Sequence, residues 1–319
     1  MEKHQITAYI YIILAVFLWA TIEIVMKLIQ NNSSPYLMNF FRFFIGGITL
    51  LIYAVSSHKM RTIWGFFKAF PQYYIPAAVI GLTGGLLLYS YGTVITQAFM
   101  SAAIISSNPI FISVYMIFLQ GEKRSPSKIV GIILGFLGML LIITNFQFAE
   151  FFQDDYVKGN LLVLAGTCFW VVDLILGKLV MKKSVQNLIV VNTEGDSHAS
   201  ENFNMKVSSL DFNLVTFLVA SLVMLPYLIF SSEWNNMIHQ SAETWLGLFY
   251  IGIFTTGIAY LFFFKGLESL EASKGSNFFY LKPIFATILA FFILNEAPSI
   301  YFYVGVVIEV IALILISNN

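Results

Sequence analysis

The chain consists largely of ten runs of about twenty consecutive, mostly apolar residues. The hydrocarbon core of a bilayer is roughly 30 Å thick, so a helix needs about 20 apolar residues to cross it. Most of the runs are continuous rather than alternating, which favours helices over a β-barrel. We therefore expect an all-α membrane protein with ten transmembrane helices. The predicted spans are residues 7–29, 36–56, 74–92, 102–119, 127–144, 159–181, 212–230, 245–266, 275–294 and 299–316.

The low content of charged residues supports this interpretation. Only 11% of the 319 residues are Asp, Glu, Lys or Arg, and the formal net charge is zero. Ordinary soluble domains carry roughly 25% charged residues. The composition excludes a cytosolic enzyme, a disordered chain and a nucleic-acid binder held by a basic surface. The single cysteine, Cys168, leaves no intrachain disulfide and no cysteine-based metal site.

The distribution of lysine and arginine predicts the orientation. If the N-terminus is cytoplasmic, the inner segments hold twelve of the 17 basic residues and the outer loops hold only Lys158. Short cytoplasmic loops carry the excess of basic residues in membrane proteins. We therefore expect a multi-pass protein of the cell membrane with both termini in the cytoplasm.

The second half of the chain repeats features of the first. At an offset of 174 residues the proline, glutamate and glycine matches are the hardest to obtain by chance in so apolar a chain. The matched positions are residues 109–111 (Pro-Ile-Phe) with 283–285, Gly92 with Gly266, Ala98 with Ala272, Phe118 with Phe292, Glu122 with Glu296, Ser125 with Ser299, and residues 130–131 (Val-Gly) with 304–305.

The first spans of the two halves align at a different offset. A shift of 151 residues pairs Trp19 with Trp170 and Lys27 with Lys178. The difference between the offsets places 23 extra residues in the second half, within the polar segment 182–210. We expect this segment to be a cytoplasmic loop insertion.

Each half is expected to contain five spans, in domains 1–146 and 156–319. Because five is odd, the second half enters the membrane in the opposite sense, which makes the two halves an inverted repeat. Two such units packed together can expose a central cavity to each side of the membrane in turn.

These features resemble the EamA-like, ten-helix form of the drug/metabolite transporter superfamily. The resemblance is carried by the repeated Pro-Ile-Phe, Glu and Gly positions, by Trp19 and Trp170, and by Arg42. Two features depart from it, because Glu309 replaces the counterpart of Gly135 and no arginine in the second half matches Arg42. The resemblance implies a carrier of small metabolites, with an amino acid or a related solute as substrate and export as the direction.

Ionisable residues inside the spans are the candidates for substrate binding. A charge at the bilayer centre costs at least about 2.5–3.5 kcal/mol, so a charge that persists there is expected to face a partner or a water-filled cavity. We expect a central cavity with a polar lining and aromatic walls. The predicted lining is Lys282, Arg42, Glu23, Asp173, Glu309 and Asn108, and the predicted walls are Trp19, Trp170 and Tyr280.

Structural alternatives remain open for the candidates in the first two spans. Glu23 and Lys27 are four residues apart on one helix face, so they can neutralise each other. Arg42 either pairs with Glu23 or another acid, or offers its guanidinium to a substrate carboxylate.

The candidates in the later spans also allow more than one interpretation. Asp173 needs either a partner other than Lys178 or a proton, and Lys178 is expected to anchor at the inner interface. Lys282, like its counterpart Asn108, directly precedes a proline, which frees a backbone carbonyl and indicates a bent helix beside the pathway. Glu309 can pair with Lys282 or Arg42, titrate as a proton-coupling group, or lie at a dimer interface.

Glu122 and Glu296 lie at the ends of spans and are expected to cap helices or fix loops. The sequence contains no motif of a hydrolase, a zinc protease or a nucleotide-binding loop, so we expect no enzyme, no metal and no cofactor. The expected partners are a small-molecule substrate and the lipid bilayer, not nucleic acid, with a homodimer as an open alternative. A non-transporting scaffold or sensor, and a membrane-embedded lipid-modifying enzyme, are the rival functions.

Overall fold

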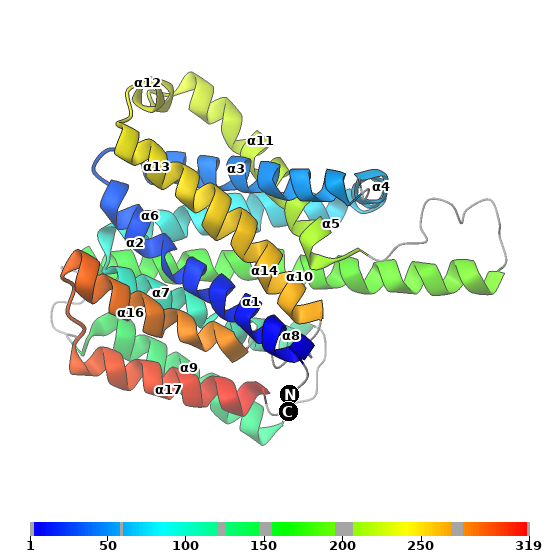
Figure 1. Cartoon of the computed structure of the whole chain (residues 1–319). Helices are drawn as coiled ribbons and strands as arrows, with labels where there is room; N and C mark the ends of the chain where they lie inside the picture. Colours follow the sequence, from blue (N-terminus) through cyan, green and yellow to red (C-terminus); the bar gives the residue numbers. More distant parts are fainter. Residues whose placement is uncertain are drawn as a thin grey trace.

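The computed structural model describes residues 3–57, 60–119, 125–146, 155–194, 207–268 and 277–317, and all regular structure in these residues is helical (Figure 1). In the first half of the chain the elements are α1 (Lys3–Ala20), α2 (Ile22–Ile29), α3 (Pro35–Ser56), α4 (Met60–Ala69), α5 (Pro71–Pro76), η1 (Ala77–Leu86), α6 (Leu87–Ile95), α7 (Ala98–Ser106), α8 (Asn108–Leu119) and α9 (Pro126–Thr144). In the second half they are α10 (Asp155–Glu194), α11 (Ser209–Phe230), α12 (Glu233–Ile238), α13 (Ala242–Tyr250), η2 (Ile251–Ile258), α14 (Ala259–Glu268), η3 (Asn277–Tyr280), α16 (Leu281–Leu294) and α17 (Ile300–Ser317).

The helices match the predicted spans. Within the described residues, eight helical stretches are long and apolar enough to cross a membrane, and two shorter stretches, Phe278–Leu294 and Ile300–Ile316, are also apolar. An all-α membrane fold with about ten spans is therefore confirmed. The eight longer stretches are Gln5–Ile29, Pro35–Ser56, Pro71–Ile95, Ala98–Phe118, Pro126–Thr144, Asp155–Val185, Ser209–Phe230 and Ala242–Leu267.

Serine side chains define several helix starts. The Ser34 hydroxyl accepts a hydrogen bond from the Leu37 amide at 3.2 Å, and Ser125 and Ser241 cap α9 and α13 in the same way. A serine oxygen before a helix satisfies an amide that has no partner within the helix. At α3 and α9 a proline directly follows the serine, where its missing N–H costs nothing.

Two spans contain a π-helical segment in their middle. Both segments, η1 and η2, begin at residues that are 174 positions apart, the offset at which the two halves of the sequence match. Extended π-helix is rare, and single π-turns often mark functional sites. Its recurrence in two corresponding spans points to a shared structural role.

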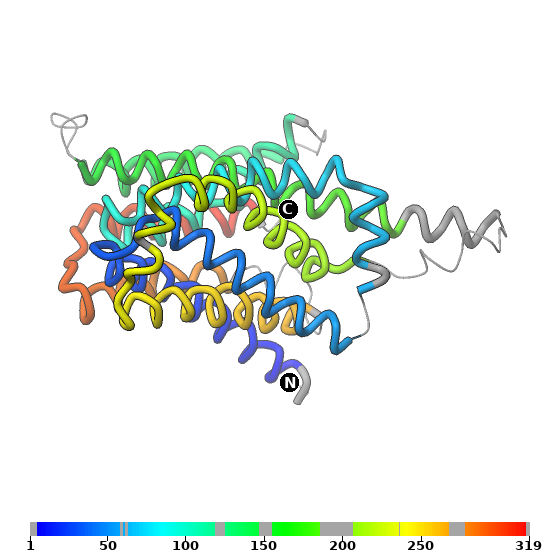
Figure 2. Tube along the Cα trace, turned by 90° about the horizontal axis from the view of Figure 1, so that it is seen from above, coloured from blue at the N-terminus to red at the C-terminus, as the bar shows by residue number. Residues whose placement is uncertain are grey.

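The pairing of helices is symmetric between the halves. The first span, α1, packs against α14 and α16, and the sixth span, α10, packs against α6 and α7. Helix α3 packs against α11, and α9 packs against α17 (Figures 1 and 2). Exchanging each span with the one five places later maps the contacts of α1 onto those of α10, and maps the α3–α11 and α9–α17 pairs onto themselves. The repeat boundaries 1–146 and 156–319 stay a prediction.

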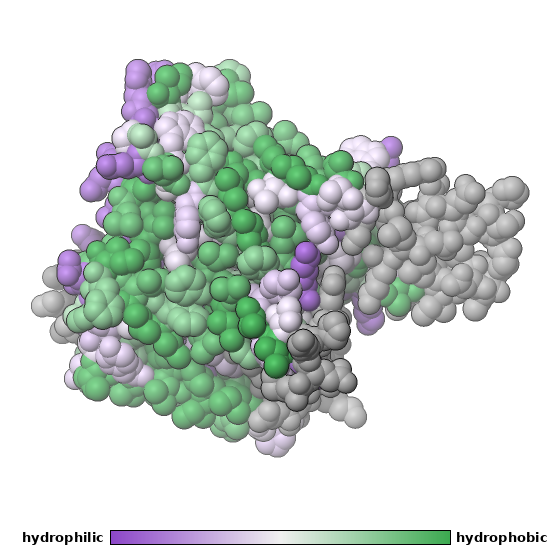
Figure 3. Space-filling view, viewed as in Figure 1, coloured by the Kyte–Doolittle hydropathy of each residue, from purple (hydrophilic) through white to green (hydrophobic). Residues whose placement is uncertain are grey.

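The outer surface is suited to lipid. Many large apolar side chains are exposed on the helices, including Ile52, Phe230 and Phe292. In the space-filling view the side of the bundle is mostly hydrophobic, and hydrophilic residues gather toward its left end (Figure 3). Helix α1 begins and α17 ends toward the same end of the bundle (Figure 1), as an even number of spans requires.

The segment predicted as a loop insertion differs in its first part. Helix α10 continues through Glu194, so residues 182–194 are helical rather than loop. The lysines at its start and the apolar residues at 188–191 allow helix to continue beyond the hydrophobic span. Residues 195–206 of the insertion, and Glu122 with its expected capping role, lie outside the described residues.

Candidate functional site

A cavity of about 250 Å³ lies inside the bundle and is lined by both halves of the chain. Its lining includes Trp19 at the end of α1, Arg42 in the first half of α3 and Asn213 near the beginning of α11. Its lining residues are Trp19, Ile22, Arg42, Leu86, Tyr89, Ile105, Asn108, Trp170, Leu174, Lys178, Asn213, Tyr260, Phe263, Phe264, Phe279 and Lys282.

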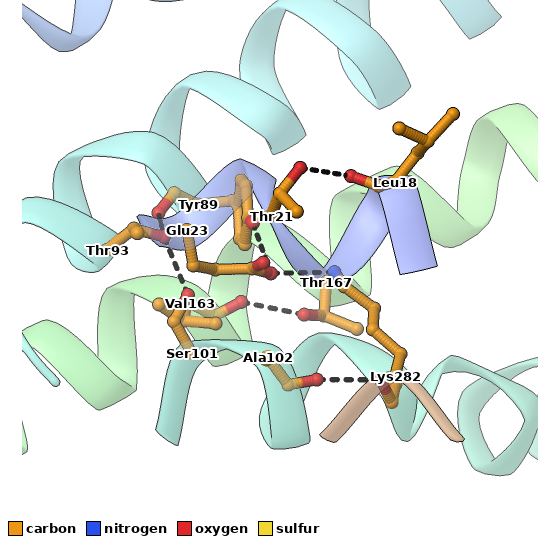
Figure 4. Close-up of polar contacts among 11 residues, drawn as sticks. Leu18, Thr21, Glu23, Tyr89, Thr93, Ser101, Ala102, Val163, Thr167 and Lys282 are labelled. Atoms are coloured by element: carbon orange, nitrogen blue, oxygen red, sulfur yellow. Dashed lines mark hydrogen bonds and ion pairs between the residues drawn. The ribbon is translucent and has the colours of Figure 1, made fainter. Parts of the chain in front are cut away.

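A buried ion pair joins the two halves at this cavity. The Lys282 ammonium lies 2.6 Å from Glu23 Oε1, and the two side chains are 5% and 0% exposed. The Tyr89 hydroxyl donates to the same oxygen at 2.6 Å. Figure 4 shows the three side chains pointing toward one another from α2, α6 and α16. The Glu23 carboxylate therefore has two partners, one of which lies 259 residues away.

The first span breaks at Thr21, just before Glu23. The Thr21 hydroxyl donates to the Leu18 carbonyl at 2.7 Å and contacts the Tyr250 hydroxyl at 2.9 Å. Helix α2 begins again at Ile22. A threonine that bonds the preceding turn competes with the helical backbone bonds, and Glu23 follows this break by two residues.

Arg42 is held from one side by a π-helical residue. Its Nε donates to the Thr256 hydroxyl at 3.2 Å. That hydroxyl donates to the Ile251 carbonyl at 2.8 Å, five residues earlier, which is the spacing of the π-helix η2. The Arg42 charge also interacts with Tyr89, Tyr260 and Lys282. Arg42 and Lys282 are thus two cations beside one paired carboxylate.

Aromatic side chains form one wall of the cavity around Trp19. The ring centre of Trp19 lies 5.2 Å from that of Tyr260, 4.9 Å from that of Phe263 and 5.0 Å from that of Phe279. Such tilted and edge-on contacts are favourable arrangements of aromatic rings. The cavity therefore combines a rigid apolar wall with a charged side.

The structure brings five of the nine predicted site residues into the cavity lining: Lys282, Arg42, Asn108, Trp19 and Trp170. Glu23 lies behind the lining, in contact with Lys282 and Tyr89. Tyr280 is half-buried beside the lining residue Phe279.

Asp173 and Glu309 lie against glycines of neighbouring helices. Asp173 is 2% exposed and packs against Gly81 of η1, where its backbone would obstruct any added Cβ. Glu309 is 4% exposed and packs against Gly138 between α9 and α17. Within the described residues, no ion pair links Glu309 to Lys282 or Arg42.

Lys27 has a partner other than Glu23. Its ammonium donates to the Val94 carbonyl at 3.1 Å and interacts with the charge of Glu296. The Glu296 carboxylate in turn accepts the amide of Ala98, the first residue of α7, at 2.8 Å. The expectation that Glu296 caps a helix is confirmed.

We expect Glu296 to make stability fall as the pH rises. Burial raises the pKa of its carboxyl above the ordinary value of 4.5. Between that value and the raised pKa, the folded protein binds more protons than the unfolded chain, so its stability decreases through this window. Glu296→Gln removes the titration, and its melting temperature relative to the wild type should rise from pH 4 to pH 7.

The comparison between the two proteins isolates this carboxyl from the other titrating groups. A difference in melting temperature that stays constant with pH would contradict the prediction. So would a wild type that gains on the glutamine variant at higher pH.

Several lining residues were not predicted from the sequence. Phe263 and Phe264 lie on α14, directly after η2, and Asn213 lies in the first turns of α11. Lys178, expected as an interfacial anchor, also lines the cavity. The sequence feature that could have indicated these residues is the glycine content in the middle of the third and eighth spans, where the π-helical segments form.

Comparisons with known proteins agree with this architecture. A model of the EamA-like transporter family matches residues 6–144 and 199–318. An uncharacterized transporter of Archaeoglobus fulgidus is 23% identical over 93% of this chain and 92% of its own length. The uncharacterized transporter YyaM of Bacillus subtilis is 22% identical over 97% and 93%.

A further relative and a solved structure extend the similarity. A chloroplastic WAT1-related protein of Arabidopsis thaliana is 24% identical over 94% of this chain and 67% of its own length. A solved crystal structure, 18% identical, has the same fold, with a TM-score of 0.63 over 98% of this chain and 97% of its own. Because the family model covers most of both halves, the chain belongs to the EamA-like transporter family.

Proposed function

We propose that the protein carries a small organic solute across the membrane by exposing its central cavity to the two sides in turn. One observation supports this most: residues of both halves line the cavity, and a buried ion pair between Glu23 and Lys282 crosses from one half to the other. Charges are retained at such depth where they face a partner or a polar pathway. The cavity volume of about 250 Å³ suits a ligand smaller than drug-sized molecules, whose pockets measure roughly 300–1,000 Å³.

The symmetric pairing of helices supports alternation. Because α1 contacts α14 and α16 as α10 contacts α6 and α7, the two halves can exchange conformations and so reverse the opening. Inverted repeats of this kind perform alternating access by rocking of one unit against the other.

The proposed setting is the cell membrane, with both termini in the cytoplasm. The bias of lysine and arginine toward the inner segments supports this orientation. We also propose export as the direction of transport.

A cysteine-accessibility experiment tests the alternation. Cys168 is the single cysteine and is replaced by serine, and Asn213→Cys then places one thiol on the cavity lining. In oriented vesicles we expect a membrane-impermeant maleimide to label this thiol from either side, and labelling from one side to prevent labelling from the other. Proteoliposomes of the serine variant measure transport directly.

Lys158→Cys is the matched control. Lys158 is an exposed residue at the start of α10 and should be labelled from one side only. If the Asn213→Cys thiol is labelled from only one side under all solute conditions, alternating access is wrong and a scaffold or sensor becomes the better explanation.

A further inference from the structure

The charges of Arg42, Lys282 and Glu23 do not balance. Arg42 is 7% exposed and Lys282 is 4% exposed, and the charge of Arg42 interacts with that of Lys282. Glu23 neutralises one cation only, through the 2.6 Å pair with Lys282. A buried charge is costly unless it is paired. The cluster of Arg42, Lys282 and Glu23 therefore holds one excess positive charge.

Two buried hydrogen-bond donors at the same cavity have no partner in the described part of the chain. They are the Nη1 of Arg42 and the indole Nε1 of Trp170. Arg42 is positioned by its Nε bond to Thr256, which leaves the end of the guanidinium available. A buried donor without an acceptor costs free energy that a ligand oxygen recovers.

The described lining contains no carboxylate. Glu23 Oε1 is held by Lys282 and Tyr89, and Asp173 packs against the backbone of Gly81. Glu23 Oε2 and Asp173 Oδ1 are buried without a described hydrogen-bond partner, but neither side chain belongs to the cavity lining. A ligand ammonium would therefore find no carboxylate on the described cavity wall, and it would add to the positive charge of Arg42 and Lys282. A ligand with acceptor oxygens satisfies both the charge and the donors.

The rest of the cavity is suited to an apolar body. Trp19, Phe263 and Phe279 form the aromatic wall, with ring centres about 5 Å from that of Trp19. A polar ligand such as a sugar would leave hydroxyl groups unpaired against these rings.

We propose that the cavity binds a small organic carboxylate that has an apolar body and no ammonium group. The carboxylate binds Arg42, with the Trp170 N–H available to a ligand oxygen, and the apolar body packs on the rings around Trp19. This assignment of the ligand class rests on the proposed transport function for its physiological meaning. The binding chemistry itself can be measured without transport.

Four probes that share a phenylethyl unit test the assignment on the purified protein. They are 3-phenylpropanoate, its amide 3-phenylpropanamide, the zwitterion phenylalanine and the cation phenethylamine. Isothermal titration should give the tightest binding for 3-phenylpropanoate. Hydrogen bonds to charged groups contribute about 1.5–3 kcal/mol, so the amide should bind about 10- to 150-fold more weakly, and the two amines more weakly still.

Two variants connect this preference to named groups. Arg42→Gln keeps a donor but removes the charge, and should abolish the discrimination between 3-phenylpropanoate and its amide. Trp170→Phe keeps an aromatic ring but removes the N–H, and should weaken 3-phenylpropanoate by about 3- to 10-fold, the value of a typical hydrogen bond. Because Trp170→Phe changes one donor only, it tests the proposal even if Arg42→Gln fails to fold.

Trp245→Phe is the matched control for the indole. Trp245 packs against Phe41 and Phe249, outside the cavity lining, and its replacement should leave all four affinities unchanged. Lys158→Gln serves the same purpose for a cation, because Lys158 is exposed at the start of α10.

The outcomes separate this inference from the proposed function. If phenylalanine or phenethylamine binds as tightly as 3-phenylpropanoate, or if none of the four probes binds, the ligand class is wrong. Labelling of Asn213→Cys from both sides would still support a carrier in either case. If 3-phenylpropanoate binds as expected but that thiol is labelled from one side only, the ligand class stands and the transport proposal fails.

Discussion

Replacing Lys282 with methionine is expected to destabilise the protein by about 3–5 kcal/mol and to abolish transport. The methionine fills a similar volume but leaves the Glu23 carboxylate, which is 0% exposed, with the Tyr89 hydroxyl as its remaining described partner. Removing one partner of a buried pair costs this much because the other charge stays buried and uncompensated. The melting temperature in detergent and uptake into proteoliposomes measure the two effects.

The double variant Glu23→Gln with Lys282→Met separates folding from function. It removes both charges and still offers the Tyr89 hydroxyl an acceptor, so most of the lost stability should return. Replacing both members of a buried ion pair with neutral groups is often close to neutral. Transport should stay absent, because the ion pair that links the two halves at the cavity is still missing.

The exposed ion pair between Lys158 and Asp155 is the control. Its side chains are 55% and 82% exposed, at an Nζ–Oδ1 distance of 2.7 Å. Exposed pairs contribute about 0–1 kcal/mol, so Lys158→Met should change the melting temperature little. If Lys282→Met proves as stable as Lys158→Met, the Glu23–Lys282 pair is not the buried interaction described above.

The fold could be predicted from the sequence because the bilayer imposes the element lengths. A run of about 20 apolar residues has few alternatives to a spanning helix, and each predicted run overlaps a helix. Serine followed by proline marks the starts of α3 and α9 for equally local reasons.

The partners within the site could not be predicted in this way. Helical spacing places Glu23 and Lys27 on one face, but Glu23 pairs with Lys282, which is distant in sequence, and Lys27 bonds the Val94 carbonyl. Which two helices meet at a residue depends on tertiary packing. Hydropathy also does not distinguish an α-helix from a π-helix. It therefore did not indicate that the Thr256 side chain of η2 would contact Arg42.

The presence of a charge within an apolar span identified the buried positions better than it identified their neighbours. Asp173 and Glu309 are buried, as a charge within a span requires. Each lies against a glycine of an adjacent helix, Gly81 and Gly138. The sequence showed these glycines and these acids separately, but the contacts between them depend on how the helices cross.

The last prediction concerns Gly84 and Gly85, two adjacent glycines at the place where the third span crosses the sixth. A Cβ on Gly85 would lie 2.7 Å from the amide nitrogen of Trp170 and 2.9 Å from the carbonyl oxygen of Gly166, both backbone atoms of α10. A Cβ on Gly84 would meet only the Val79 carbonyl, at 3.4 Å. The two positions share a helix and a sequence context but differ in the space available.

We expect Gly85→Ala to destabilise the protein by about 3 kcal/mol or more, at the upper end of the cost of overpacking, because backbone cannot move aside as a side chain can. The same change at Gly84 should be neutral or stabilising by up to about 1 kcal/mol, since alanine is the better helix former. Melting temperatures of both variants in detergent measure the difference. The displaced α10 also carries Trp170, so ligand binding should weaken in Gly85→Ala alone. Equal stability of the two variants would show that these spans do not cross as closely as the backbone contacts at Gly85 and Gly166 require.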